Sequence, residues 1–244
     1  MKESLKRILP PIVTEQIPIL KTYIKYMTNK DYFTSNSRFK NCESGKDLVI
    51  VGNGPSLKKV DLKKLNHMDM FVVNDFYVHE DFNELNIKYY FNMDPREIWF
   101  ENIVKSVPND KLNNIEFFLS FSHIERIKKM GDVLKNKNYI IHGGSTYQNY
   151  EKYLDIHRPT LGIINILQIL LVTVHYMGYK NIYLVGFDYS FLAYKNKNQI
   201  PHFHNTDNRA YKPEIEENSY TRVTCNACKL FLSLQELVKV LDKK

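Results

Sequence analysis

A glycine-containing turn after an apolar run is the first place where this sequence could do chemistry. Residues 47–51 are mostly aliphatic, and they lead into Gly52, Asn53, Gly54, Pro55 and Ser56. Glycines in a turn that follows a β-strand let backbone N–H groups approach a phosphate or a ribose. The turn lacks the third glycine of the dinucleotide fingerprint and the lysine of a Walker loop, so a plain tight turn stays open as the alternative. We predict a nucleotide-facing loop here.

Asparagines close the next two apolar runs. Asn74 ends residues 70–74, and Asn92 ends residues 88–92. Each alone is explained by the preference of asparagine for turns. Together with Asn53 they stand at corresponding ends of successive strands, and the carboxyl ends of parallel strands border the ligand crevice of an open α/β sheet. The three side chains are therefore predicted to place amide donors and acceptors around one ligand.

A candidate anion site precedes the longest apolar run of the chain. Arg158, Thr160 and Gly162 come directly before a predicted helix over residues 162–177. Thr160 is a plausible N-cap, the N–H groups after it would attract an anion, and Arg158 could pair with a phosphate or carboxylate. An ordinary helix cap beside a surface arginine is the alternative.

The run 181–186 ends in Gly186, and Asp188 and Tyr189 follow it. From there to residue 213 the chain is polar and aromatic without clear periodicity, and it contains Tyr194 and the pair His202 and His204. Long loops in compact domains are often functional, so we predict a lid at about 189–213. The histidines could act as a general base or as metal ligands, although a loop histidine is more often just solvated.

Six apolar runs of strand length set the predicted architecture: residues 47–52, 70–74, 88–92, 115–120, 138–142 and 181–186. Helical patterns lie between several of them, at 96–107, 122–134 and 162–177. Continuous apolar strands that alternate with helices indicate a mainly parallel sheet covered on both faces. We predict an α/β fold, a single Rossmann-like nucleotide-binding domain over residues 47–244, with a carboxyl-terminal helix at about 214–242.

Residues 1–46 are predicted to form a helical and irregular extension, with one amphipathic helix over residues 12–26. The extension would pack on the domain, dock on a partner or touch a membrane. The predicted carboxyl-terminal helix carries Cys225 and Cys228. Their spacing matches half a zinc site or a redox pair, but nothing in the sequence completes such a set, so we predict two core-facing thiols.

Composition and charge limit the classes of binding partner and the cellular location, but they identify no particular partner. The chain has 244 residues, is 43% hydrophobic and carries a formal charge of +7. The excess of basic residues favours anionic partners, but it is spread along the chain and gives no support for nucleic acid. Three cysteines, no evident signal peptide and no apolar run long enough to span a membrane indicate a cytoplasmic protein, with contact to the inner face of the membrane left open.

Taken in order, these motifs resemble one family of enzymes. The matching segments are Gly-Asn-Gly-Pro-Ser-Leu after the first strand, Asn-x-Phe-Tyr and Phe-Asn after the next two, Arg-x-Thr-x-Gly, Gly-Tyr-Lys-x-Ile-Tyr-Leu-x-Gly-x-Asp, and His-x-x-Asn-Thr-Asp. Residues 47–210 thereby resemble the bacterial sialyltransferases of glycosyltransferase family 42. They also look like the motility accessory factor proteins and a group similar to a pterin diphosphokinase.

The resemblance implies inverting transfer of a nonulosonic acid from its CMP conjugate, without a metal or a further cofactor. It places the nucleotide beside Gly52, Asn53, Gly54 and Ser56. It places the donor sugar beside Asn74, Asn92, Arg158, Thr160, Leu161, Gly162, Gly186 and Asp188. Leu161 stands where that family often has a serine.

For catalysis the resemblance implies that His202 is the general base. Tyr189 and Tyr194 would steady the leaving phosphate, with Arg158 as a further catalytic candidate. The implied acceptor is a glycan, a glycolipid or a protein, and a homo-oligomer is compatible with the sequence. A nucleotide-dependent phosphotransferase and a non-catalytic nucleotide-binding partner in glycan assembly remain the alternatives.

Overall fold

The computed structural model describes residues 11–93, 98–131, 133–143, 150–160, 162, 164–189 and 217–242. The predicted lid beyond Tyr189 lies outside these residues, and so do Tyr194, His202 and His204. Leu161 is outside them as well. The predictions made for these positions stay predictions.

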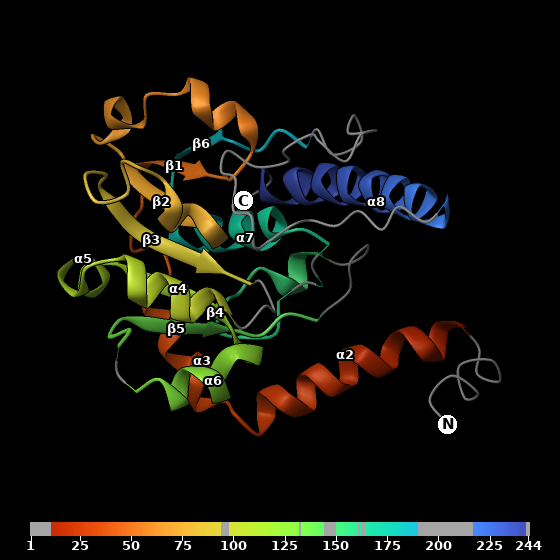
Figure 1. The fold of residues 1–244 in the computed structure, drawn as a ribbon. Coiled ribbons are helices and arrows are strands. Elements are labelled where there is room, and N and C mark those ends of the chain that lie inside the picture. Colours follow the sequence, from red (N-terminus) through yellow and green to blue (C-terminus); the bar gives the residue numbers. More distant parts are fainter. Residues whose placement is uncertain are drawn as a thin grey trace.

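The sheet has six parallel strands in the order β5-β4-β3-β2-β1-β6 (Figure 1). The strands are β1 (Asp47–Val51), β2 (Asp69–Val73), β3 (Ile87–Asn92), β4 (Glu116–Ser120), β5 (Lys137–Ile140) and β6 (Asn181–Val185). The α-helices are α2 (Pro11–Met27), α3 (Asp31–Thr34), α4 (Ile98–Ser106), α5 (Asn109–Asn113), α6 (Ile124–Lys129), α7 (Ile166–Met177) and α8 (Glu217–Leu241). Short 3-10 helices join them: η1 (Ser35–Phe39), η2 (Pro55–Lys59), η3 (Leu62–Leu65), η4 (Asn74–Val78), η5 (Phe121–His123) and η6 (Tyr150–Tyr153). The α/β fold and all six predicted strands are confirmed.

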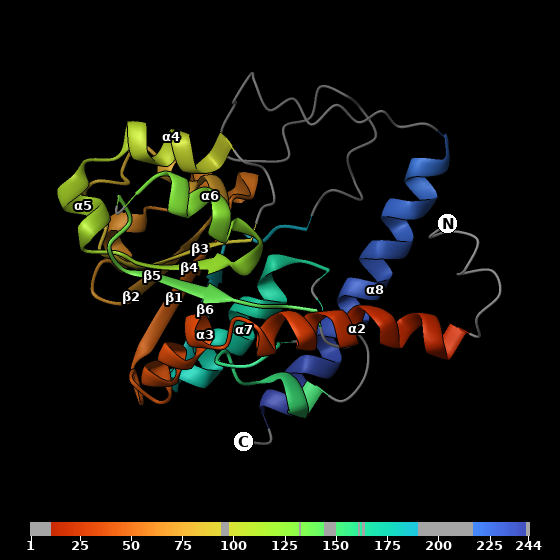
Figure 2. The same cartoon turned by 90° about the horizontal axis from the view of Figure 1, so that it is seen from below.

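Side chains of the central strands alternate between two apolar cores, one on each face of the sheet. In β1, Val49 and Val51 join the core under α4, α5 and α6, whereas Leu48 and Ile50 join the core under α7. Figure 2 shows these two helix layers with the sheet between them. Because both faces are covered, β1 and β2 are unbroken apolar runs after their first residue rather than alternating strands.

Helix α7 forms the middle of one layer, and its side chains are almost all buried, as the sequence predicts. It starts at Ile166 rather than at residue 162. Asn165 caps it: its side chain accepts the N–H of Leu167, and Gln168 reaches back to the Asn165 N–H at 3.0 Å. This reciprocal capping box satisfies the first free N–H groups of the helix, so the helix begins there. The predicted N-cap role of Thr160 is therefore wrong.

The amino-terminal segment packs on the sheet through residues 31–45. Phe33 is buried in one core and Phe39 in the other. Between them, Asn36 donates its Nδ2 to Tyr139 O at 2.8 Å and to Ile156 O at 3.0 Å. These contacts tie α3 and η1 to β5, so this stretch, predicted to be irregular, is folded onto the domain.

Helix α8 buries Ala227, Leu230 and Leu237, which recur along one side of the helix. Cys225 and Cys228 lie off that side and are exposed, so the prediction of two core-facing thiols is wrong. The apolar stripe of a helix is narrow, and both thiols fall outside it. Among the described residues, we find no helix long and apolar enough to cross a membrane.

Candidate functional site

The order of the strands locates the candidate site. From β1 the chain adds strands on one side as far as β5, and β6 then returns to the other side of β1. Because all six strands are parallel, their carboxyl ends share one edge, called the carboxyl edge below. In open α/β sheets ligands bind at this edge, where the strand order reverses. Here the reversal lies between β1 and β6, next to the loops Gly52–Ser56 and Gly186–Tyr189.

These two loops are joined by backbone hydrogen bonds that continue the sheet. Gly52 N–H donates to Val185 O at 2.8 Å, and Gly54 N–H donates to Gly186 O at 2.7 Å. Ser56 N–H donates to the Asp188 carboxylate at 2.9 Å. Two segments 132 residues apart in the sequence thus form one paired unit at the end of the sheet.

The glycines make this pairing possible. A Cβ on Gly52 would lie 2.4 Å from Gly186 O, and a Cβ on Gly54 would lie 2.1 Å from Asp188 Oδ2. Gly186 adopts a φ of +70°, which favours glycine. The physical reason for these glycines is the close approach of two loops. The N–H groups of Gly52, Gly54 and Ser56 already donate within the protein, so these three are not presented to a phosphate.

The loop after β1 instead presents a hydrogen-bond acceptor. Asn53 donates its Nδ2 to Val73 O at 3.1 Å, which bridges the ends of β1 and β2 and fixes the orientation of the carboxamide. Its Oδ1 is buried and has no partner among the described residues. A buried carbonyl oxygen without a donor costs free energy, of the order of 1–3 kcal/mol, which a bound ligand with a donor group would recover.

Asn74 repeats this feature at the end of β2. Its Oδ1 is also buried without a partner in the described part of the chain, and its backbone has a φ of +45°. The backbone carbonyl of Asn74 accepts the hydroxyl of Tyr90 at 2.5 Å and also the indole N–H of Trp99. Strained φ values persist where the surroundings fix them, and they concentrate at binding sites.

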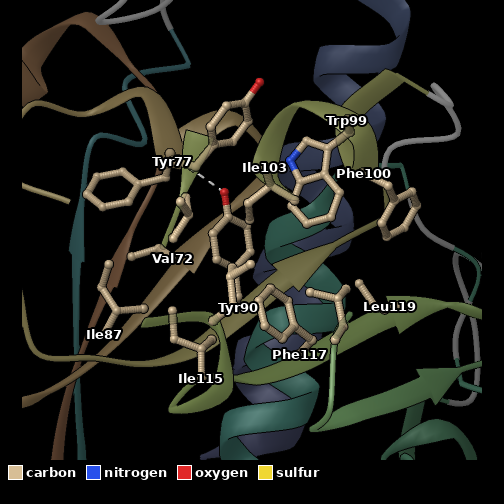
Figure 3. Packing of buried hydrophobic residues seen from close by; sticks show 14 of the residues in the cluster. Val72, Tyr77, Ile87, Tyr90, Trp99, Phe100, Ile103, Ile115, Phe117 and Leu119 are labelled. Atoms are coloured by element: carbon tan, nitrogen blue, oxygen red, sulfur yellow. Dashed lines mark hydrogen bonds between the residues drawn. The ribbon is translucent and has the colours of Figure 1, made fainter. Parts of the chain in front are cut away.

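Figure 3 shows the packing around Tyr90, whose hydroxyl donates to this carbonyl. Tyr90 lies between Trp99 and Phe117 in the apolar core, and its hydroxyl accepts the N–H of Tyr77 at 3.1 Å. Burial, with a smaller contribution from the charge of Asp75, raises the pKa of Tyr90 well above its usual value. The hydroxyl therefore remains a donor to Asn74 O at every physiological pH.

Two further polar side chains lie at the ends of β2 and β3. Asn92 is the last residue of β3 and is fully buried. Asp75 follows Asn74 in η4 and is 6% exposed. The sequence analysis did not select Asp75, although a carboxylate directly after a strand-end asparagine is a signal of the same kind. A buried carboxylate at the carboxyl edge is a candidate site residue because buried titratable groups are common in functional sites.

Tyr189 joins the β6 loop to the start of α7. It has a φ of +47°, and its hydroxyl donates to Asn165 Oδ1 at 3.3 Å. Burial raises its pKa, so the phenol remains a proton donor at neutral pH. The ring also packs edge-on against Phe231 of α8. This places Tyr189 at the carboxyl edge, and it makes Asn165 a second residue that the sequence analysis missed as part of the site.

Thr160 and Arg158 lie near β5, on the side of the sheet farthest from β6. Thr160 is fully buried, forms a β-bridge with His142 and donates its N–H to Ile141 O at 2.9 Å, so it pairs with the residues that follow β5. Arg158 is exposed; burial raises the pKa values of Tyr23 and Tyr176, and the charge of Arg158 opposes this rise. Strand β5 is at the far end of the sheet from β6. The structure thus groups Gly52, Asn53, Gly54, Ser56, Asn74, Gly186, Asp188 and Tyr189, and it places Arg158 and Thr160 apart from them.

His142 is a histidine at the carboxyl edge that the sequence analysis did not select. It follows β5, and burial together with the charge of Lys25 lowers its pKa, so its imidazole is neutral at pH 7. A histidine at the end of a predicted strand could have been found by the reasoning that selected Asn74 and Asn92. The described residues contain no group of three or more His, Cys, Asp or Glu placed to hold a metal ion.

Comparison with known proteins gives one result that bears on this site. A search of the curated proteins found no match. A family model described as 6-hydroxymethylpterin diphosphokinase MptE-like matches residues 20–194. The match covers all six strands and both paired loops of the carboxyl edge. A diphosphokinase is a transferase, so the family is transferase-like. The chain belongs to the 6-hydroxymethylpterin diphosphokinase MptE-like family.

Proposed function

We propose that this chain is a glycosyltransferase that moves a sialic acid-like sugar from a CMP-sugar to an acceptor hydroxyl, with the donor bound at the carboxyl edge between β1, β2 and β6. The observation that carries the proposal is the unpartnered Oδ1 of Asn53, repeated at Asn74. Both atoms are acceptors, and they would accept hydrogen bonds from donor groups such as sugar or ribose hydroxyls or the amino group of cytosine. An ionised phosphate accepts hydrogen bonds but does not donate them, so it is a poor partner for these two oxygens.

In this proposal the donor phosphate is held by groups other than the first three N–H groups of the β1 loop. The hydroxyl of Tyr189, which donates to Asn165 Oδ1 at 3.3 Å, would turn to the phosphate when the nucleotide binds, and its raised pKa keeps it protonated. The chemical step requires a base that takes the proton of the acceptor hydroxyl as the bond from the sugar to the CMP phosphate breaks. The family resemblance assigns that role to His202, and the released CMP carries the negative charge.

The first experiment measures thermal stability with CMP, CDP, UDP, GDP and ATP, each with and without Mg²⁺. A ligand that binds the folded state at about 100 times its Kd adds about 2.7 kcal/mol, which for a chain of this size raises Tm by roughly 5 °C or more. We expect this shift with CMP or CDP and no need for Mg²⁺. A response to ATP alone that strictly requires Mg²⁺ would contradict the proposal.

The Asn53→Ala variant tests the carboxamide itself. Loss of the Oδ1 acceptor should reduce the affinity for CMP about fivefold to tenfold, the usual effect of one neutral hydrogen bond. Asn36→Ala is a matched control, since Asn36 also has a buried Oδ1 without a described partner but lies against β5. Asn36→Ala should lower Tm and leave the CMP-induced shift unchanged. Equal CMP affinity in the wild type and in Asn53→Ala would remove Asn53 from the site.

His202→Ala should keep CMP binding and lose sugar transfer by a factor of about 100 or more, because general-base catalysis contributes at least that much. His204→Ala is the neighbouring control and should retain most turnover. Product formation from CMP-N-acetylneuraminic acid with a panel of glycan acceptors is the measurement. Unchanged turnover in His202→Ala would show that this histidine is not the base.

A pyrophosphoryl transfer from ATP is the second candidate, and the description of the matching family supports it. That reaction would use a divalent cation held by carboxylates, among which Asp75 and Asp188 are the described residues near the paired loops. The same panel separates the two candidates. An ATP response that disappears without Mg²⁺, together with AMP release on adding a hydroxymethylpterin, would establish the second.

A further inference from the structure

Helix α2 attaches to the domain by a narrow face near its carboxyl end. Tyr26 is buried in the core with Phe33. Thr22 lies so close to Gly143 that a Cβ there would be 2.3 Å from the Thr22 Oγ1. Lys25 lies over the ring of Phe121 at 4.9 Å. These contacts fix how the helix is turned about its axis, and they place its last turns beside the carboxyl end of β5.

A different face of α2 is apolar and exposed. It consists of Ile17, Leu20, Tyr23, Ile24 and Met27, called the α2 stripe below. Four of its members follow the spacing 3, 4, 3, which puts them on one side of a helix. Leu20 is 61% exposed and Met27 is 67% exposed. Scattered exposed leucines need no explanation, but an ordered stripe of this kind marks a surface that is covered by something else.

Helix α2 extends past the carboxyl edge of the sheet (Figures 1 and 2). In both views α2 runs away from α3 and beyond the ends of β4 and β5, so that its amino-terminal half stands off the sheet (Figures 1 and 2). The carboxyl ends of the strands face the same way. A partner that binds α2 would therefore lie beside the carboxyl edge.

The charges next to the stripe decide between two kinds of partner. Lys21 and Lys25 are the charged residues among the described side chains of α2, and both are basic. Two copies of the helix paired along the stripe would bring lysines together without an acidic residue in the described flanks to pair with them. An anionic surface would be complementary instead. Apolar side chains beside lysines, with a tyrosine at the border, are typical of helices that lie in the interface of a bilayer.

We propose that the α2 stripe docks this chain on the surface of an anionic lipid bilayer, with α2 lying in the interface and the carboxyl edge beside it. The apolar side chains would enter the boundary of the acyl chains, and Lys21 would face the lipid headgroups. This docking is separate from the proposed function, because it needs no particular sugar or nucleotide. It would bring acceptors held in the bilayer close to the site.

The test is co-sedimentation of the full chain with vesicles. The probe is an equal mixture of phosphatidylglycerol and phosphatidylcholine, and pure phosphatidylcholine is the neutral reference. We expect binding to the mixed vesicles that weakens in high salt and is much weaker on the neutral ones. Leu20→Glu should reduce binding about tenfold or more, the effect of withdrawing one buried leucine. Lys21→Glu should reduce binding to the mixed vesicles only.

Leu232→Glu is the matched control, because Leu232 lies on α8 and is 62% exposed, almost the same as Leu20. It should bind vesicles like the wild type. The proposal is overturned if the wild type does not sediment with the mixed vesicles, or if Leu20→Glu and Leu232→Glu bind equally. It is also overturned if the wild type is a dimer by light scattering and Leu20→Glu makes it a monomer, since the stripe would then be covered by a second copy.

Discussion

Gly54 shows how one residue type can be required for a reason other than the one its motif suggests. The sequence motif indicates a phosphate-facing glycine. In the structure the backbone of Gly54 has an ordinary φ of −69°, and the space that a side chain would need is filled by Gly186 O and the Asp188 carboxylate. No feature of the β1 loop alone could reveal this, because the neighbour that fills the space comes from 132 residues later in the chain.

Gly54→Ala should therefore destabilise the fold by about 2 kcal/mol, as expected when a methyl group is forced into a filled space. It should also separate the two loops, since the Asp188 side chain must turn away and give up the Ser56 N–H. Urea unfolding measures the first effect, and the loss of the nucleotide-induced Tm shift measures the second.

Gly131→Ala is the control for Gly54→Ala. Gly131 has a φ of +69° and open space around its Cβ position, so alanine there costs only backbone strain, about 1 kcal/mol. It should leave nucleotide binding intact. Equal effects of the two substitutions on nucleotide binding would show that the paired loops do not form the site.

At the scale of elements, the start of α7 links the helix layer to the site. Asn165 caps the helix and accepts the hydroxyl of Tyr189, so the same carboxamide oxygen serves stability and position. The sequence carries the capping signal, an asparagine three residues before Gln168. Thr160 misled the prediction because it precedes an apolar residue and lies in an Arg-x-Thr-x-Gly motif, whereas tertiary pairing with β5 determines its conformation.

Asn165→Ala should lower the free energy of unfolding by about 1 kcal/mol, the usual cost of a lost N-cap. It should also weaken nucleotide binding, because Tyr189 loses the contact that holds its phenol at the carboxyl edge. Urea unfolding and a nucleotide titration measure the two effects on the same protein.

Asp61→Ala provides the comparison for Asn165→Ala. Asp61 caps η3 by accepting the Lys63 N–H at 3.2 Å, far along the chain from α7. That substitution should cost a similar free energy and leave the nucleotide affinity unchanged. Unaltered nucleotide affinity in Asn165→Ala would show that the orientation of Tyr189 does not matter for binding.

At the scale of the whole molecule, the two edges of the sheet differ in kind. The end of the sheet at which the strands begin, called the amino edge, is stabilised by a cluster of paired charges. Glu43 accepts hydrogen bonds from Tyr89 at 2.6 Å, from Lys88 at 2.8 Å and from Lys46 at 2.7 Å. The carboxyl edge holds the buried oxygens of Asn53 and Asn74 without described partners. One edge stabilises the fold, and the other keeps unused hydrogen-bonding capacity for a ligand.

The low pKa of Glu43 makes the free energy of unfolding fall as the pH falls below 4.5. Burial would raise the pKa of Glu43, but the hydrogen bonds and charges of its partners outweigh burial and hold it at about 2, below its ordinary value of 4.5. The ionised group therefore stabilises the fold above pH 4.5, and this contribution disappears as the pH falls toward 2. Glu43→Gln should cost roughly 2 to 3 kcal/mol at pH 7 and progressively less between pH 4.5 and pH 2.

Urea unfolding of wild type and Glu43→Gln across this pH range is the measurement. Glu84→Gln is the control, because Glu84 is an exposed partner of Lys63 and should change stability little at any pH. A difference between wild type and Glu43→Gln that is constant from pH 7 to pH 3 would contradict the assignment of the low pKa.

The sequence predicts the strands and the α/β fold of this molecule much better than the contacts between residues distant in the chain. All six strands could be found, because β1 to β5 are largely buried and mostly apolar, and β6 has a strand-like composition of apolar and aromatic residues although it is largely exposed. Helix α7 could be found for the same reason. What could not be found depends on pairs far apart in the chain: the Gly54–Asp188 contact, the bridge of Thr160 to His142, and the burial of Asp75. The residue types at these positions are compatible with several neighbours, and only the fold selects one.

The position of β6 has a consequence for how the protein is made. Strand β1 can pair with β2 soon after both leave the ribosome. The other side of β1 stays unpaired until β6 has been made, because the residues of β6 lie 134 positions later. At ordinary rates of synthesis that delay is roughly 10 s. During this time the aliphatic edge of β1 is open to wrong partners. The paired glycine loops can form only after β6 has been made, so a nascent chain gains the proposed nucleotide site late in its synthesis rather than gradually.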